Sequence, residues 1–377
     1  MSAGIEIRRA RPEEREKVLQ AANESFSRPG RPFDFMKVRP YCFTAKRIPD
    51  HWVCLEEGNI LGLIGVYPFT VRMAGIEFRS AGIGQVATLP LARGRGVMSS
   101  LLREITAAMD TQYDFTWLWG DRQRYGRYGW EKGGIAYGFE TFDKYLPDPP
   151  PEKEVRPLDK SADFERIYDF AMRQPYCVMM ERDEFQTLIN TSDISGWAWR
   201  NAWVLCRPND SSVLMADGDA ETVAGLLSHL VRLEKRTEGD RWKVSFESGP
   251  YDSVITQVAS RHFWQVKRSA SASFRICDPA GYFSKAAAAV LPPPGGDDEL
   301  SLRSTDTGRE VRLRCRNGRY EVEPEAGTKA FELSPRELSE VAFGTLPLET
   351  ALPGLSPQSP LRPLLRLPAY VSHLYAL

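Results

Sequence analysis

The sequence predicts a mixed α/β (α+β) protein of several domains. Its 377 residues suggest two or three domains at roughly 150 residues each. Segments that alternate every two residues, as strands do, are interspersed with segments of helical periodicity. A stretch rich in proline and charge at residues 146–157 is typical of a linker.

The first 142 residues indicate a strand, a helix and a three-stranded antiparallel meander, followed by a second helix and two strands. Acidic residues after Pro12 begin the first helix, and turns at 57–59 and 74–75 separate the meander strands. The expected strands are 5–8, 52–56, 60–72, 76–89, 115–119 and 136–142, and the expected helices are 12–26 and 97–109.

Two further regions follow the linker. The region directly after the linker is expected to form another α/β unit. The region after that begins near Phe274 and includes a helix that Ser334 caps. The expected helices are 162–172, 221–235, 279–290 and 335–343, and the expected strands are 203–207, 212–216, 242–247, 300–303 and 310–314, with one more after Gly318.

Composition excludes several classes of protein. Lys plus Arg is 49 and Asp plus Glu is 50, a balance that argues against a nucleic-acid partner. The most apolar run, 60–66, is far shorter than the ~20 residues of a membrane-spanning helix, so we expect no membrane partner. The beginning of the chain resembles no secretory signal, and six scattered cysteines form no C-x-x-C pair, so we expect a cytoplasmic protein with reduced thiols. No two histidines have ligand spacing, and we expect no metal.

The most informative motif is Arg93-Gly-Arg-Gly96, which lies between a predicted strand and a predicted helix. Backbone N–H groups at a helix N-terminus are unsatisfied and attract anions, and the glycines allow close approach. Arginines add charged donors. The motif therefore predicts a pyrophosphate site, although an ordinary loop with solvated arginines fits these residues equally well. It is neither a Walker loop nor a Rossmann fingerprint.

The order of elements, with Tyr125 and Gly129-Trp130 after the fifth strand, resembles the GNAT acyltransferase superfamily. Arg93-x-x-Gly96 matches that family's coenzyme loop, with Met98 in place of its final small residue. In this loop and in the segments 86–88 and 124–130, the sequence is similar to the enhanced-intracellular-survival (Eis-type) acetyltransferases. That resemblance implies two tandem GNAT-like domains followed by a sterol-carrier-like α/β domain, with boundaries at 1–147, 148–272 and 273–377.

The resemblance implies an N-acetyltransferase with acetyl-CoA as co-substrate. It implies coenzyme contacts from ten residues: Val86, Ala87, Thr88, Arg93, Gly94, Arg95, Gly96, Val97, Met98 and Asp121. A backbone N–H at 86–88 is expected to bind the thioester oxygen. Tyr125 is expected to protonate the departing thiolate, because a phenol of pKa ~10 and a thiol of pKa ~8.5 differ little. The alternative for Tyr125 is packing alone.

In the Eis-type family the C-terminal carboxylate acts as general base, which here implies Leu377. Family members usually end in an aromatic residue shortly after an acidic one, whereas this chain ends His373-Leu-Tyr-Ala-Leu377. Asp121 or a water molecule is a competing base, and His373 is another candidate by its ordinary pKa. The apolar end itself suggests a docked tail.

Glu24, Phe26 and Phe33 are candidates for the acceptor site, because they flank the expected cleft. The acceptor is expected to be a primary amine of a small molecule or of a lysine side chain. We also expect a homo-oligomer. The alternative function is a non-catalytic protein that binds acyl-CoA or an apolar ligand and retains a relict GNAT domain.

Overall fold

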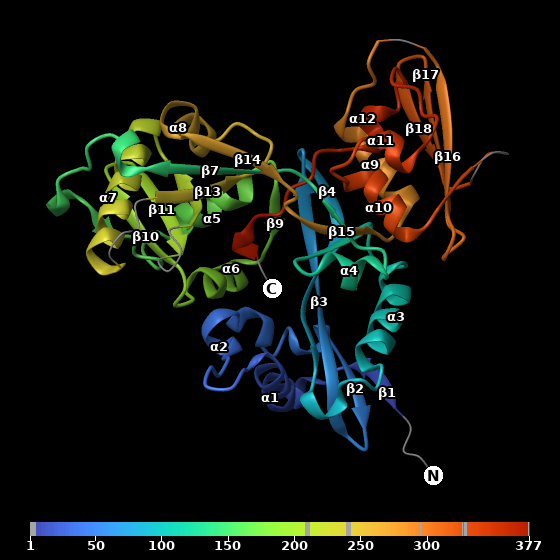
Figure 1. Cartoon of the computed structure of the whole chain (residues 1–377), viewed down its shortest axis with the longest axis horizontal. Helices are drawn as coiled ribbons and strands as arrows, with labels where there is room; N and C mark the ends of the chain where they lie inside the picture. The colour runs from blue at the N-terminus through green and yellow to red at the C-terminus, as the bar shows by residue number, and fades with distance from the viewer. Residues whose placement is uncertain are drawn as a thin grey trace. The chain divides into compact units, whose positions relative to one another are not determined.

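The structure is a computed structural model that describes residues 5–207, 212–238, 243–294, 296–325, 327, 330–375 and 377. The chain forms two compact units (Figure 1). The first unit comprises Met1–Gly134, Ala270–Ala369 and Ala376–Leu377, and the second comprises Ile135–Ser269 and Tyr370–Tyr375. No helix in the described ranges is long and apolar enough to cross a membrane.

A twisted sheet organises the first unit, with strand order β1-β2-β3-β4-β5-β15-β6. Strands β1 to β4 are antiparallel, and β4 pairs with β5 in parallel. The strands are β1 (Glu6–Arg9), β2 (His51–Glu56), β3 (Asn59–Met73), β4 (Ile76–Thr88), β5 (Phe115–Leu118), β6 (Glu131–Gly133) and β15 (Ala272–Ile276).

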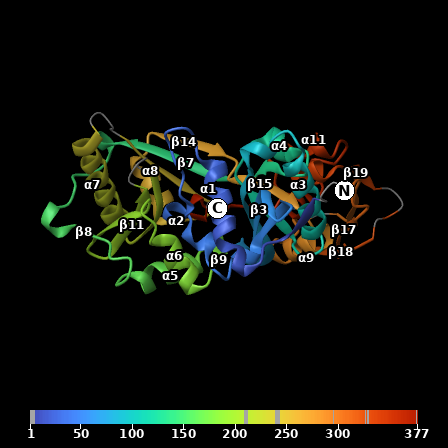
Figure 2. The same ribbon diagram turned by 90° about the horizontal axis from the view of Figure 1, so that it is seen from below.

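Helices cover both faces of this sheet. Helix α1 (Arg15–Phe26) lies on one face and α3 (Val97–Met109) on the other (Figure 1; Figure 2). Apolar residues recur at helical spacing in α3, and Val97, Leu101 and Ile105 are buried. They pack on buried residues of β3 and β4, including Ile64 and Ile83. The short helices α2 (Phe35–Val38) and α4 (Arg122–Gly126) complete this part.

The C-terminal part of the first unit forms a second, smaller sheet with strand order β18-β17-β16-β19. Helix α9 packs on β17 and β18, and α10 packs on β6 and β15. The elements are α9 (Pro279–Ala289), β16 (Asp298–Ser304), β17 (Glu310–Arg316), β18 (Arg319–Glu323), β19 (Phe331–Leu333), α10 (Pro335–Phe343), α11 (Leu348–Ala351) and α12 (Arg362–Leu365).

Buried polar bonds hold the segment after α4 to β15 and to α10. Arg275 of β15 donates from Nη2 to Asp110 at 3.1 Å and from Nε to the carbonyl of Tyr128 at 2.9 Å. The hydroxyl of Ser339 in α10 donates to the carbonyl of Gly129 at 2.9 Å. Residues 128–129, which follow α4, are therefore held by both β15 and α10.

The second unit has its own sheet, with strand order β14-β7-β13-β12-β11-β10-β8. Among the described strands of this sheet, only β12 and β13 pair in parallel. Helices α7 and α8 pack against each other and bury Val223, Leu227 and Val258 in the core of this unit. The elements are β7 (Ala136–Phe142), β8 (Arg156–Pro157), α5 (Phe164–Arg173), β9 (Cys177–Met179), α6 (Arg182–Ile189), β10 (Ser195–Trp199), β11 (Ala202–Arg207), β12 (Ser212–Asp217), α7 (Ala220–Glu238), β13 (Lys243–Ser248), α8 (Val254–His262) and β14 (Gln265–Ser269).

The mixed α/β fold class is confirmed, and the strands of the meander and the helix at 97–109 occur where the sequence predicts them. The first helix differs, because residues 12–14 form a 3-10 turn and α1 begins at Arg15. Trp242, at the start of one predicted strand, lies outside the described residues. Strand β7, which precedes the predicted linker, lies in the sheet of the second unit. The boundaries at 147 and 272 stay a prediction.

A series of buried hydrogen bonds links His51 of β2 to Tyr67 of β3 and Gln85 of β4. The imidazole Nδ1 of His51 faces the carbonyls of Arg47 and Ile48, each at 3.3 Å, so this nitrogen carries the proton of the neutral ring. Nε2 then accepts from the Tyr67 hydroxyl at 2.9 Å, and that hydroxyl also contacts the side-chain amide of Gln85. Burial lowers the pKa of His51 to about 4.

This depressed pKa predicts a loss of stability in acid. The unfolded chain binds a proton at His51 below about pH 6.5, whereas the folded protein resists it until about pH 4. The contribution of neutral His51 to the free energy of unfolding is therefore complete above pH 6.5. It is lost as the pH drops to 4, by up to about 3 kcal/mol. In urea unfolding, the stability difference between wild type and His51→Gln should narrow by that amount over this range. A constant stability difference between wild type and His51→Gln over this range would contradict the prediction.

Candidate functional site

Strands β4 and β5 separate at the centre of the first unit. Their parallel register ends at Gly82–Trp117, although β4 continues to Thr88. Beyond Gly82, β4 pairs only with β3, and that pairing shifts register between Leu63 and Gly65. Backbone groups of 84–88 that face away from β3 therefore have no strand partner within the described sheet, and they form one wall of an opening.

The chain passes from this wall into the N-terminus of α3. After the 3-10 turn η4 (Pro90–Ala92), Gly96 takes a left-handed conformation with φ of 77° and precedes the first residue of the helix. No side chain among the described residues caps α3, so its first N–H groups keep their donor capacity. A Cβ at Gly96 would meet no atom within 4 Å, so the backbone is open to an incoming ligand.

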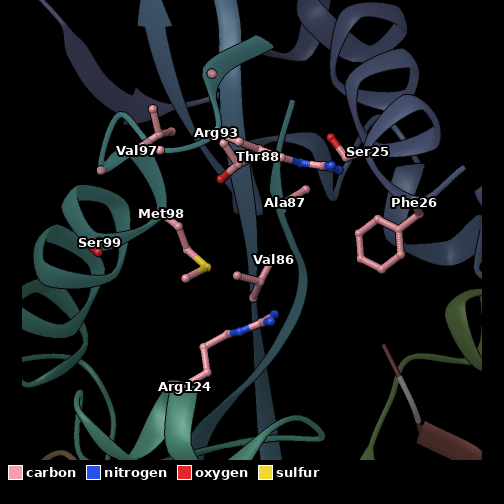
Figure 3. A pocket seen from close by; sticks show the side chains of 13 residues that line it. Ser25, Phe26, Val86, Ala87, Thr88, Arg93, Val97, Met98, Ser99 and Arg124 are labelled. Carbon is pink, nitrogen blue, oxygen red and sulfur yellow. The ribbon is translucent and has the colours of Figure 1, made fainter. Parts of the chain in front are cut away.

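A pocket of about 550 Å³ lies between these elements. Figure 3 shows side chains from α1, β4, the loop, α3 and α4 around it. It is lined by Ser25, Phe26, Val86, Ala87, Thr88, Ala92, Arg93, Gly94, Gly96, Val97, Met98, Ser99 and Arg124. Eight of the ten expected coenzyme contacts are thus brought together here, while Arg95 and Asp121 are not among the lining residues.

Two arginines line the pocket from opposite sides. The side chain of Arg93 extends toward Ser25 of α1, and Arg124 of α4 points up toward Val86 (Figure 3). Arg95 instead pairs with Glu56 at the end of β2, with Nη1 and Oε2 3.1 Å apart. Gly94 lies between the two arginines with a φ of 77°, and this turn of the backbone directs their side chains apart.

Tyr125 lies in α4 next to the pocket-lining Arg124. Its side chain is only 7% exposed, and its ring meets the edge of Trp130 with centroids 6.4 Å apart. Burial raises the pKa of the Tyr125 phenol above its ordinary value of 10, and the Arg124 guanidinium opposes this rise. The phenol therefore keeps its proton at neutral pH, as a proton donor must. The same ring also belongs to the core beside α3.

Helix α4 is fastened at its first residues. Asp121 caps it by accepting from the backbone N–H of Arg124 at 2.7 Å, so this carboxylate is already engaged. Arg122 and Arg336 of α10 each donate from Nε to the buried carboxylate of Glu131, both at 2.6 Å. These bonds hold α4 and the residues after it in one position.

The last residue of the chain lies against the opening between β4 and β5. A Cβ built on Gly84 would lie 2.7 Å from Cβ of Leu377 and 3.2 Å from its carboxyl carbon. A Cβ on Gly82 would likewise collide with the Leu377 side chain. The two glycines thus leave the space that the terminal residue takes. His373, four residues earlier, belongs to the second unit, where its Nε2 is 3.7 Å from Glu247 Oε2.

The three expected acceptor residues are placed differently. Phe26 lines the pocket, and the ring of Phe33 lies tilted against that of Phe26, with ring centroids 5.8 Å apart. Glu24 lies away from both, in a separate depression of about 300 Å³ that it shares with Lys17 and Asn59. On helix α1, residues two positions apart point in different directions, which separates Glu24 from Phe26.

Sequence reasoning missed Ser25, Ala92, Ser99 and Arg124 as lining residues. Ser99 follows from helical geometry, since the first turn of α3 surrounds its N-terminus. Arg124 could have been predicted from its position directly before the candidate residue Tyr125. Ser25 had none, because only tertiary packing brings α1 to this pocket.

A profile of the acetyltransferase (GNAT) domain family matches residues 6–133, which include β1 to β6 and the pocket. The chain therefore carries a GNAT acetyltransferase domain. No curated protein sequence matches the chain.

Several solved structures share the fold over nearly the whole chain. A GCN5-related N-acetyltransferase from Kribbella flavida aligns with a TM-score of 0.70 at 19% identity, covering 99% of this chain and 98% of that one. One from Anabaena variabilis aligns with 0.68 at 17% identity, covering 98% and 99%. Eis1 from Mycobacterium abscessus aligns with 0.64 at 16% identity, covering 96% of each chain.

Proposed function

We propose that the protein is an acetyl-CoA-dependent N-acetyltransferase that acts on a primary amine of a small molecule or a lysine side chain. The observation that carries the proposal is the pocket formed by the free edge of β4, the loop 93–96 and the uncapped N-terminus of α3. The GNAT domain match over 6–133 supports acyl transfer from a coenzyme A thioester in general.

The pocket fits the coenzyme by the chemistry of its donors. A pyrophosphate needs several N–H donors and cationic side chains, and the first turn of α3, Arg93 and Arg124 offer both. The unpaired edge of β4 is formed here by Val86, Ala87 and Thr88. The amide groups of an extended ligand can hydrogen-bond to this edge as a neighbouring strand would. Bound there, acetyl-CoA supplies an acetyl thioester as the acyl donor.

The residues of the chain then divide the work of direct transfer. A backbone N–H at 86–88 donates to the thioester oxygen as negative charge develops on it. The amine must be neutral to attack, and the Leu377 carboxylate beside Gly84 is the group we assign to take its proton. Tyr125 donates its phenolic proton to the departing sulfur, directly or through one water.

We also propose that the chain is an Eis-type acetyltransferase. Its first domain would end near residue 147, a second GNAT-like domain near 272, and a sterol-carrier-like domain would follow. The similarity over nearly the full length to Eis1 from Mycobacterium abscessus supports this organisation at the level of the fold. A cytoplasmic homo-oligomer remains our expectation for its location and assembly.

Gly96→Val tests the coenzyme site. Valine strains the left-handed backbone at φ 77° and fills the open approach to the helix N-terminus. We expect the Kd for acetyl-CoA to rise at least ~10-fold, about 1.4 kcal/mol, in calorimetry. Gly75→Val is the matched control, because Gly75 has φ of 81° and equally open surroundings in the turn after β3. An unchanged Kd for Gly96→Val would refute the assignment of the loop.

Thiol release from acetyl-CoA tests the activity itself. Wild type should release coenzyme A only when an amine acceptor is present, and Gly75→Val should do the same. Tight acetyl-CoA binding without amine-dependent release across polyamines, aminoglycosides, aromatic amines and lysine peptides would favour the non-catalytic binding protein instead.

A further inference from the structure

We infer that the amine acceptor is an aromatic or similarly apolar primary amine that also carries an anionic group, and not a polycation. This inference rests on the proposed function, because it names the substrate class of the same site. It is carried by an exposed apolar surface next to the pocket and by the positive charge of the segment that forms it.

The apolar surface consists of Phe26, Phe33 and Met36, which we call the phenylalanine surface. These side chains are 40%, 36% and 37% exposed, although large apolar side chains are usually buried. Phe26 also lines the pocket, so the surface is continuous with it. The buried Phe35 supports both exposed rings, at centroid distances of 5.1 Å from Phe26 and 4.7 Å from Phe33.

The loop that carries this surface is fixed by its own hydrogen bonds. Arg28 and Arg31 form a tight turn with two backbone bonds of 3.1 and 2.9 Å. The hydroxyl of Ser27 accepts from the backbone N–H of Phe33 at 2.9 Å, and Asn23 Oδ1 accepts from that of Phe35 at 2.9 Å. A preformed apolar surface loses little conformational entropy when a ligand binds to it.

The same segment is positively charged. Residues 26–39 contain Arg28, Arg31, Lys37 and Arg39 against Asp34 alone, a net charge of +3. The Asp34 carboxylate accepts from the backbone N–H of Met36 at 3.0 Å and lies 3.9 Å from Lys37 Nζ, so it is already compensated.

A further arginine lies beside the surface. Arg15 of α1 has its Nη2 3.8 Å from Met36 Sδ, and its Nη1 is 3.0 Å from Glu16 Oε1. Glu24, the acidic residue that a cationic acceptor would need, lies in the other depression. The Leu377 carboxylate remains for one ammonium group at the reacting centre. A molecule with one amine, an apolar body and an anionic group matches this distribution, whereas a polyamine meets net positive charge.

Three probes separate these possibilities: 4-(2-aminoethyl)benzoate, 2-phenylethylamine, which lacks only its carboxylate, and spermidine. We expect kcat/KM to be at least ~10-fold higher for the benzoate than for 2-phenylethylamine, and lowest for spermidine. The advantage of the benzoate should shrink as salt is added, since the arginines are exposed. Equal rates for the two aromatic amines, or a preference for spermidine, would overturn the inference.

Variants identify the residues responsible. Arg28→Gln combined with Arg31→Gln should bring the ratio between the two aromatic amines close to one and leave the rate with 2-phenylethylamine nearly unchanged. Phe33→Ala should lower kcat/KM for both aromatic amines alike. Lys17→Gln is the matched control, because it removes a positive charge from the depression that holds Glu24, and it should keep the wild-type ratio.

The acceptor and the activity can fail separately. If spermidine is acetylated best, the proposed function stands and the acceptor class is wrong. If no amine is acetylated, the proposed function falls, and calorimetry of the three probes with the coenzyme A-loaded protein decides the inference. Tighter binding of the benzoate that Arg28→Gln with Arg31→Gln abolishes would uphold it, and equal or absent binding would reject it.

Discussion

Replacing Tyr125 with phenylalanine should lower kcat about 100-fold while the Kd for acetyl-CoA stays within error of wild type. The substitution keeps the buried ring and its contact with Trp130 and removes only the proton donor. A single acid–base group usually contributes 10²–10⁴-fold, and the departing thiolate is stable enough to place the effect near the lower end. Steady-state and single-turnover rates with an excess of acceptor measure it.

The pH profile adds a second signature. Because burial raises the pKa of Tyr125 above 10, the phenol stays protonated over the whole neutral and mildly alkaline range. In wild type, kcat should therefore not decline through loss of this proton below about pH 10. Tyr128→Phe is the control, since it removes a phenolic hydroxyl from the same segment at a residue to which we assign no chemical step. Normal turnover in Tyr125→Phe would assign this side chain to packing alone.

Extending the chain beyond Leu377 by two residues should lower kcat by about 100-fold or more with an unchanged Tm. The extension converts the terminal carboxylate beside Gly84 into an amide, which accepts no proton, and it keeps every side chain of the tail. Deleting 375–377 is a poorer test, because Tyr375 is buried in the second unit and its loss would lower stability.

Leu377→Ala is the matched control for the extension. It keeps the terminal carboxylate and the Cβ beside Gly84 and removes the part of the side chain that lies against Gly82, so activity should fall much less than in the extended chain. Activity of the extended chain should recover partly as the pH approaches the pKa of the acceptor amine, because more of the amine is then neutral without a base. Full activity in a folded, extended chain would exclude Leu377 as the base.

Local signals in the sequence determined much of the first unit. The apolar repeat of 97–109 predicts α3 because side chains three and four positions apart share a face. In the structure that face, from Val97 to Met109, is buried in the core. The Arg-Gly-Arg-Gly turn predicts an open helix N-terminus, and Gly96 adopts the left-handed backbone there. Ser334 with Glu337 predicts the capped start of α10, which the structure confirms. Each of these depends on residues close in sequence.

Tertiary structure alone decided which distant segments meet. Strand β15, residues 272–276, enters the sheet between β5 and β6, although it follows β6 by about 140 residues and β5 by about 155 residues along the chain. The chain end lies at Gly84 because β4 and β5 separate after Gly82 and both glycines lack side chains. The side chain of Arg95 points toward Glu56, and that of Glu24 points away from Phe26, because side chains at these positions leave the backbone in different directions. Such pairings depend on the shapes and charges of surfaces that form only on folding, so composition, periodicity and spacing do not encode them locally.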